Sequence, residues 1–198
     1  EKVKDNFHVT LLAKDYEGYK NLMKLTSIAH MEGYYYKPRF SKEILKEHSK
    51  GIICFSGCPA AEIPQFLIDG NYEEAKKLTQ WYADCFKDDF YLELQRHGYD
   101  KILPNITDTA LRSTLSNVHN ENKLVEDGVI KLSRELGIPL VATNDAHYIK
   151  KSDAEAQDAL VCIATGKNVS DIKRLRYIDN PDFYIKSPDE MEDLFSDL

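Results

Sequence analysis

The stretch Pro139-Leu140-Val141-Ala142-Thr143-Asn144-Asp145-Ala146-His147-Tyr148 joins an apolar run to a polar pair. The run 139–143 is short and β-prone, follows Gly137 and ends abruptly in polar residues, which is typical of a buried strand. In α/β folds, chemistry is placed at the carboxyl ends of parallel strands. Asp145 and His147 stand there, and side chains two residues apart on extended backbone can reach one cation. The alternative is an Asp that caps the next helix beside an ordinary surface His.

Composition describes a globular domain rather than a basic nucleic-acid-binding segment. The chain has 198 residues, of which 42% are hydrophobic and 11% aromatic, which is enough for a core. Its net charge is −7, from 33 acidic and 26 basic residues, so phosphate neutralisation by bulk charge is not expected. No apolar run reaches the ~18 residues of a membrane span, and residues 1–5 show no signal-peptide pattern. We therefore expect a cytoplasmic protein without membrane contact, its four cysteines reduced.

Strand and helix patterns alternate along the chain. Strands are predicted at 7–13, 51–55, 90–95 and 139–143, with a short one at 183–186. Helices are predicted at 16–31, 41–50, 60–68, 72–86, 124–136 and 152–164, with a last one from Pro188. Three helix starts show a capping pattern, namely Asn71 with Glu74, Ser152 with Glu155, and Ser187 with Glu190. This order predicts an α/β fold of parallel strands packed against helices.

Residues 99–122 break the alternation. The segment is polar, contains Pro104 and is rich in Asn, Ser and Thr. It is predicted to be an inserted loop, poorly ordered or helical, on the surface of the domain.

Residues that can bind metals lie beside successive predicted strands. His8 is at the start of the first strand, Cys58 follows the second, His97 follows the third, and Asp145 with His147 follows the fourth. A mixed set of imidazole, thiolate and carboxylate groups suits zinc or another late first-row divalent ion. Each residue also has a purely structural alternative: Cys58 as a small buried filler, His8 as a core histidine, and His97 as a ring stacked in a loop.

Seven ordered motifs resemble one known family. They are 7–14 with 18–22, Tyr35-Tyr36-Lys37-Pro38-Arg39, 56–63, 91–98, 141–148, 156–163 and 183–191. Together they resemble the PHP (polymerase and histidinol phosphatase) domain of the bacterial replicative DNA polymerase III alpha subunit, in the class without an inserted exonuclease domain. The resemblance covers nearly the whole chain outside 99–122.

The resemblance implies a fold and a ligand set. The family's domain is a distorted seven-stranded α/β barrel of parallel strands with outer helices, so we expect residues 1–198 to form the larger, C-terminal part of such a barrel. Residues 165–198 would run toward a polymerase palm that this chain does not contain. The resemblance carries metal-ligand roles onto His8, Cys58, Asp145 and His147, and leaves His97 as a structural or supporting residue. The family's opening His-x-His pair is missing, so the chain resembles an excised part whose first ligands lie upstream of Glu1.

The same resemblance implies function. The parent protein would be a DNA-directed DNA polymerase that uses magnesium at carboxylates outside this chain and acts on DNA and deoxynucleoside triphosphates. It would work with a sliding clamp and a clamp loader. The PHP domain would support the polymerase and, with zinc or manganese, could remove nucleotides as a 3′–5′ exonuclease. Two alternatives are a structural, partner-binding platform and a free-standing phosphoesterase similar to histidinol phosphatase. The chain alone is expected to be inactive and to self-associate through unpaired strand edges.

Overall fold

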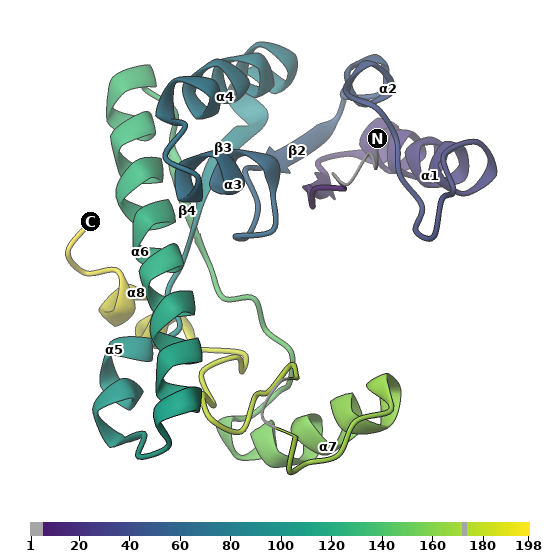
Figure 1. Cartoon of the computed structure of the whole chain (residues 1–198). Helices are drawn as coiled ribbons and strands as arrows, with labels where there is room; N and C mark the ends of the chain where they lie inside the picture. Colours follow the sequence, from purple (N-terminus) through teal and green to yellow (C-terminus); the bar gives the residue numbers. More distant parts are fainter. Residues whose placement is uncertain (1–5, 172–173) are drawn as a thin grey trace. The chain divides into compact units, whose positions relative to one another are not determined.

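The computed structural model of this chain describes residues 6–171 and 174–198. The expectation for the opening five residues therefore lies outside it. The described residues form a mixed α/β structure (Figure 1). The chain divides into two compact units. Unit 1 is Glu1–Glu93 with Val125–Val141, and unit 2 is Leu94–Leu124 with Ala142–Leu198. Among the described residues, no helix combines the length and apolar character that crossing a membrane would require.

Within residues 6–171 and 174–198, four strands form a sheet in the order β1-β2-β3-β4. They are β1 (Thr10–Ala13), β2 (Ile52–Phe55), β3 (Phe90–Gln95) and β4 (Leu140–Thr143). The pair β2–β3 is parallel, with Cys54 opposite Phe90, as the alternation of elements predicts. The described residues thus form a four-stranded mixed sheet, which is compatible with part of the seven-stranded barrel expected from the family resemblance, and the closed barrel stays a prediction.

The expectation of parallel strands is wrong for the first pair, because β1 and β2 run antiparallel with Ala13 opposite Ile52. Two helices connect these strands, α1 (Tyr16–Met31) and α2 (Lys42–Glu47). After these helices, β2 begins beside the end of β1, where Lys14 N–H donates to Gly51 O at 2.8 Å. The alternation of strands and helices predicts how many connections join the strands. It does not predict at which end of the neighbouring strand each connection finishes.

Unit 1 is held by a close approach of α1 to the start of β2. A Cβ on Gly18 would lie 1.7 Å from the carbonyl oxygen of Gly51, so only glycine permits this contact. Asp15 begins α1 by accepting a hydrogen bond from Gly18 N–H at 2.8 Å. The core also receives α3 (Glu62–Ile68) and α4 (Tyr72–Phe86). Its fully buried side chains include Leu25, Leu45, Ile52, Ile63, Phe90, Leu92, Val129 and Leu132.

The segment 99–122 is helical over most of its length. It contains α5 (Tyr99–Ile102), the 3-10 turn η2 (Leu103–Asn105) and the first part of α6 (Thr109–Leu136), which extends through both units. The expected helix start at Leu124 is wrong by 15 residues, because Asp108 begins the helix by accepting from Leu111 N–H at 2.8 Å. Leu111, Leu115 and Val118 recur at helical spacing and are half-buried, a signal that the many Asn, Ser and Thr residues obscure.

Unit 2 packs around aromatic rings. Tyr148, Ala154 and Tyr177 are its buried cluster, with Val161, Phe183 and Tyr184 packed against them. The main helices here are α7 (Ala154–Thr165) and α8 (Pro188–Leu194). The short strand expected at 183–186 forms only an isolated bridge between Tyr184 and Tyr148, because α8 begins directly after it at the Ser187 cap.

Candidate functional site: two metal-ligand pairs

His8 and Cys58 come together in unit 1 although 50 residues separate them. His8 bridges to Ala61 in parallel fashion, and its N–H donates to Ala60 O at 3.1 Å, which fixes its backbone against the loop after β2. The Cys58 sulfur lies 3.7 Å from His8 Nδ1. Gly57 has a φ of +86°, and a Cβ on it would lie 2.6 Å from the Ala61 Cβ, so the loop needs glycine to make this approach. His8 is exposed and Cys58 is half-buried, so both can reach a ligand.

Asp145 and His147 form a second pair, in unit 2. His147 Nδ1 lies 2.7 Å from the backbone carbonyl oxygen of Asp145, and 4.0 Å from its carboxylate. A carbonyl can only accept, so Nδ1 carries the proton and the lone pair of Nε2 is left for a ligand. The ring also lies against Tyr177 and Phe183, with centroids 4.8 and 5.9 Å away. Asp145 has a positive φ of 22°, an uncommon conformation for a residue other than glycine.

The two pairs belong to different units. Within the part of the chain that the structure describes, no group of three or more His, Cys, Asp or Glu side chains could hold a metal ion. Each pair on its own offers donors that suit zinc, namely thiolate with imidazole and carboxylate with imidazole. Convergence of all four side chains stays a prediction.

The surroundings of His97 are those of a buried, stacked ring rather than of a metal ligand. Its side chain is buried and stacks on Phe183 at a centroid distance of 4.3 Å, and the Asn180 amide donates to its carbonyl oxygen at 2.7 Å. Burial lowers the pKa of His97 to about 4, against the opposing effect of Asp145, so the ring is neutral at pH 7. The alternative of a ring stacked in a loop describes this residue well.

A large groove opens beside His8 in unit 1. Its volume is about 1360 Å³, and its walls include His8, Tyr82 and the whole loop that joins α1 to α2. From that loop come the side chains of the aromatic-basic run Tyr34-Tyr35-Tyr36-Lys37-Pro38-Arg39. The sequence signal for this wall is the aromatic-basic run itself. Residues 35–39 of this run entered the sequence analysis as one of the seven motifs of the family resemblance.

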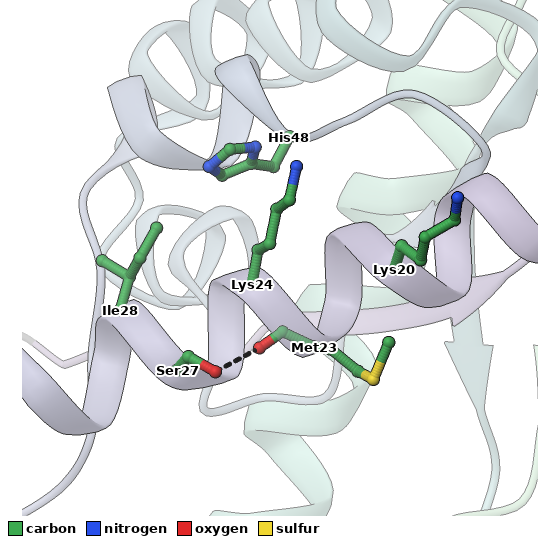
Figure 2. A pocket seen from close by; sticks show the side chains of 6 residues that line it. All are labelled: Lys20, Met23, Lys24, Ser27, Ile28 and His48. Carbon is green, nitrogen blue, oxygen red and sulfur yellow. Dashed lines mark hydrogen bonds between the residues drawn. The ribbon is translucent and has the colours of Figure 1, made fainter.

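A smaller groove of about 340 Å³ lies between α1 and the end of α2. Lys20, Met23, Lys24, Ser27 and Ile28 of α1 line it together with His48 at the end of α2 (Figure 2). The Ser27 hydroxyl donates to Met23 O at 2.8 Å and so faces its own helix. This groove contains none of the predicted metal ligands.

Comparison with protein families finds a similarity over the N-terminal part of the chain. A family model described as "PHP domain" matches residues 1–97. Residues 1–97 are therefore similar to the PHP domain family. The matched residues include His8 and Cys58, and the match ends before Asp145 and His147.

The chain is also similar to curated proteins that are much longer. It is 45% identical over 195 residues to DNA polymerase III subunit alpha of Borreliella burgdorferi, covering 98% of this chain and 15% of that protein. It is 42% identical over 208 residues to the subunit of the same name from Helicobacter pylori strain 26695, covering 100% and 15%. The Deinococcus radiodurans subunit is 42% identical over 186 residues, covering 94% and 12%. The chain thus spans about 15% of the length of the curated relatives it matches.

Proposed function

We propose that this chain is the PHP-domain portion of a bacterial DNA polymerase III alpha subunit. The similarity to relatives of that name, over 94 to 100% of the chain, supports the proposal. On this proposal the parent protein is a cytoplasmic DNA-directed DNA polymerase. It uses magnesium at carboxylates outside this chain, takes DNA and deoxynucleoside triphosphates as substrates, and works with a sliding clamp and a clamp loader. The barrel of the PHP domain is then completed by residues outside this chain.

Within that protein, we propose that the PHP domain is a metal-dependent 3′–5′ exonuclease. The observation that carries this is the approach of Cys58 Sγ to His8 Nδ1 at 3.7 Å. A soft sulfur and an imidazole nitrogen at this separation fit two positions around one zinc or manganese ion, with zinc the better match for sulfur. Asp145 and His147 would supply further ligands.

The residues of this chain would do the following work. His8, Cys58, Asp145 and His147 would hold the cation, which when bound would neutralise charge on a phosphodiester and lower the pKa of water. The carbonyl oxygen of Asp145 fixes the proton of His147 on Nδ1 and so directs Nε2 outward as a donor. Buried His97 stays neutral and adds no charge that would repel a cation.

A structural platform is the second candidate, and exposed apolar side chains in unit 2 favour it. Between 149 and 185, large apolar residues are 40 to 78% exposed, namely Ile149, Leu160, Ile163, Val169, Leu175, Ile178 and Ile185. Exposed apolar groups in such number suit contact with another part of the parent protein or with a partner subunit. A free-standing phosphoesterase is the weaker alternative, because the relatives are polymerase subunits.

Metal content and nuclease activity of the full-length parent separate these functions. We expect the parent to retain zinc or manganese through purification, and to release nucleotides from a labelled DNA 3′ end. Cys58→Ser and His147→Ala should abolish both properties and leave polymerisation intact. His48→Ala is the matched control, because His48 lines the smaller groove. A parent that holds no metal, or whose exonuclease survives both variants, would favour the platform.

The 198-residue chain alone is expected to show negligible phosphoesterase activity, because metal sites depend on their full ligand set.

A further inference from the structure

The loop between α1 and α2 exposes three consecutive tyrosines. The exposed fractions of Tyr34, Tyr35 and Tyr36 are 61, 59 and 84%. Large aromatic rings are usually at least half-buried, so three exposed in a row indicate a surface that contacts something. Lys37 follows directly and Arg39 comes two residues later, which places cations beside the rings.

Contacts within the loop support the conformation that it adopts. Tyr35 N–H donates to Lys37 O at 3.1 Å, which closes a tight turn around Tyr36. Gly33 lets the two ends of the loop approach, since a Cβ there would lie 1.8 Å from Arg39 O. Tyr36 has a φ of +60°, a costly conformation for a tyrosine and one that tends to occur at functional sites. The turn therefore holds the Tyr36 ring outward at a conformational cost.

The rings and the guanidinium are also arranged against one another. Tyr35 and Tyr36 meet edge to face with centroids 4.7 Å apart. The Arg39 guanidinium lies 4.7 Å from the centroid of the Tyr35 ring, and one of its N–H groups donates to Asn6 Oδ1 at 2.9 Å. Arg39 is thus positioned over the ring with other N–H groups left for an anion.

The loop and His8 line the same groove. Lys42, also in its wall, pairs with Glu62 at 2.7 Å, and Lys37 and Arg39 are the cations that the loop itself contributes to the groove. Exposed aromatic faces interleaved with a few cations are the surface on which single-stranded nucleic acid binds, by stacking of bases and neutralisation of phosphates. A proline-rich peptide would use the rings but would have no need of the cations.

We propose that the loop Tyr34–Arg39 seats the end of a single-stranded nucleic acid, with a base stacked on Tyr36 and the adjacent phosphate facing Lys37 and Arg39. The strand would then lie in the groove whose wall contains His8. Only the biological role of this binding site rests on the proposed function. The binding itself needs no metal, so the two can fail separately.

The size of the effect follows from the contacts. Loss of one stacked base weakens binding about 5- to 150-fold, which is the expectation for Tyr36→Ala. Two facing cations predict a slope of log K against log salt of about −1.4 for a single strand. Tyr36→Phe keeps the stacking face and should bind nearly as well as the unaltered chain. Tyr36→Gly removes the ring and relieves the positive φ, so it should lose binding without losing stability.

The experiment measures fluorescence anisotropy of a labelled ten-nucleotide oligothymidine with the 198-residue chain in EDTA. The matched control is Tyr16→Ala on α1. Tyr16 is also exposed, stacks near Tyr19 at 6.3 Å and lies under Lys20, but it is outside the groove. We expect loss of binding with Tyr36→Ala and Tyr36→Gly, retention with Tyr36→Phe, and no change with Tyr16→Ala.

Other outcomes would overturn the inference. These are no binding in EDTA, equal losses for Tyr16→Ala and Tyr36→Ala, or tighter binding of a labelled polyproline peptide than of the oligothymidine. None of these results touches the metal proposal, which depends on Cys58 and His147. Conversely, a parent without exonuclease activity whose Tyr36 variants still lose the oligothymidine would refute the metal-dependent function and leave this binding site standing.

Discussion

Replacing Asp158 with asparagine removes one charge from an ion pair that lies almost entirely out of water. The Arg174 guanidinium donates to both carboxylate oxygens of Asp158, at 2.8 and 2.6 Å, and both side chains are only 1% exposed. Tyr177 N–H donates to the same carboxylate at 3.0 Å. The pair therefore links α7 to the chain segment that carries Tyr177, a member of the aromatic cluster of unit 2.

The expected destabilisation follows from this burial. Removing one partner of a buried ion pair leaves the other charge uncompensated, which costs roughly 3–5 kcal/mol. Asparagine keeps the shape and one acceptor, so we expect about 3 kcal/mol for Asp158→Asn. With a urea m-value of about 2 kcal/mol/M, the unfolding midpoint should fall by about 1.5 M.

The effect should depend on pH in a defined direction. Hydrogen bonding from Arg174 lowers the pKa of Asp158 below its ordinary value of 3.8. A carboxyl whose pKa is lower in the folded state stabilises the fold above its unfolded pKa, and that stabilisation is lost as the pH falls through the folded pKa. The difference between the variant and the unaltered chain should be full at pH 7 and should shrink below about pH 3.8.

Urea unfolding followed by circular dichroism at pH 7 tests the magnitude, and hydrogen exchange of the Tyr177 amide tests the location. That amide should exchange faster in Asp158→Asn, because its acceptor is weakened. Glu74→Gln is the control, since Glu74 pairs with Lys77 on the surface, where both side chains are more than half exposed. If the two variants unfold at the same urea concentration at pH 7, the buried pair does not stabilise unit 2.

Three further outcomes are expected. Gly18→Ala should destabilise unit 1 by about 3 kcal/mol or more in urea unfolding, because its Cβ would lie 1.7 Å from the Gly51 carbonyl oxygen; an unchanged midpoint would disprove this close approach. In native conditions a thiol reagent should modify Cys58 well before Cys54, whose thiol is fully buried and has its pKa raised by that burial; equal rates measured by mass spectrometry would contradict the burial. Deleting 106–122 with a short linker should leave unit 1 folded by Trp81 fluorescence, and an insoluble product would show that the segment is not dispensable.

Local patterns in the sequence predicted most element boundaries. The bounds of α1 and of β3 coincide with the predicted ranges 16–31 and 90–95, because each carries a periodic apolar face and a clear stop. Capping patterns were less reliable. Of three, only Ser187 with Glu190 forms a capping box, while Asn71 makes no side-chain cap and Glu74 pairs with Lys77 instead. A capping pattern states only which bonds are possible, and neighbouring charges compete for the same groups.

The candidate site depends on contacts between segments that lie far apart in the sequence. Residue types could be predicted from the sequence, and these contacts could not. His8 and Cys58 carry no mutual signal in sequence, and their approach depends on the bridge from His8 to Ala61 and on the positive φ of Gly57. The residue types suggested a metal, but the distance of 3.7 Å needed the fold. The same holds for Asp158, which reads in sequence as one more polar residue on a helix. Its partner Arg174 lies 16 residues on, beyond the helix end, so no helical spacing could link the two. Local pattern therefore predicts which side chains are available in this chain, and turns and bridges that join distant segments decide which of them meet.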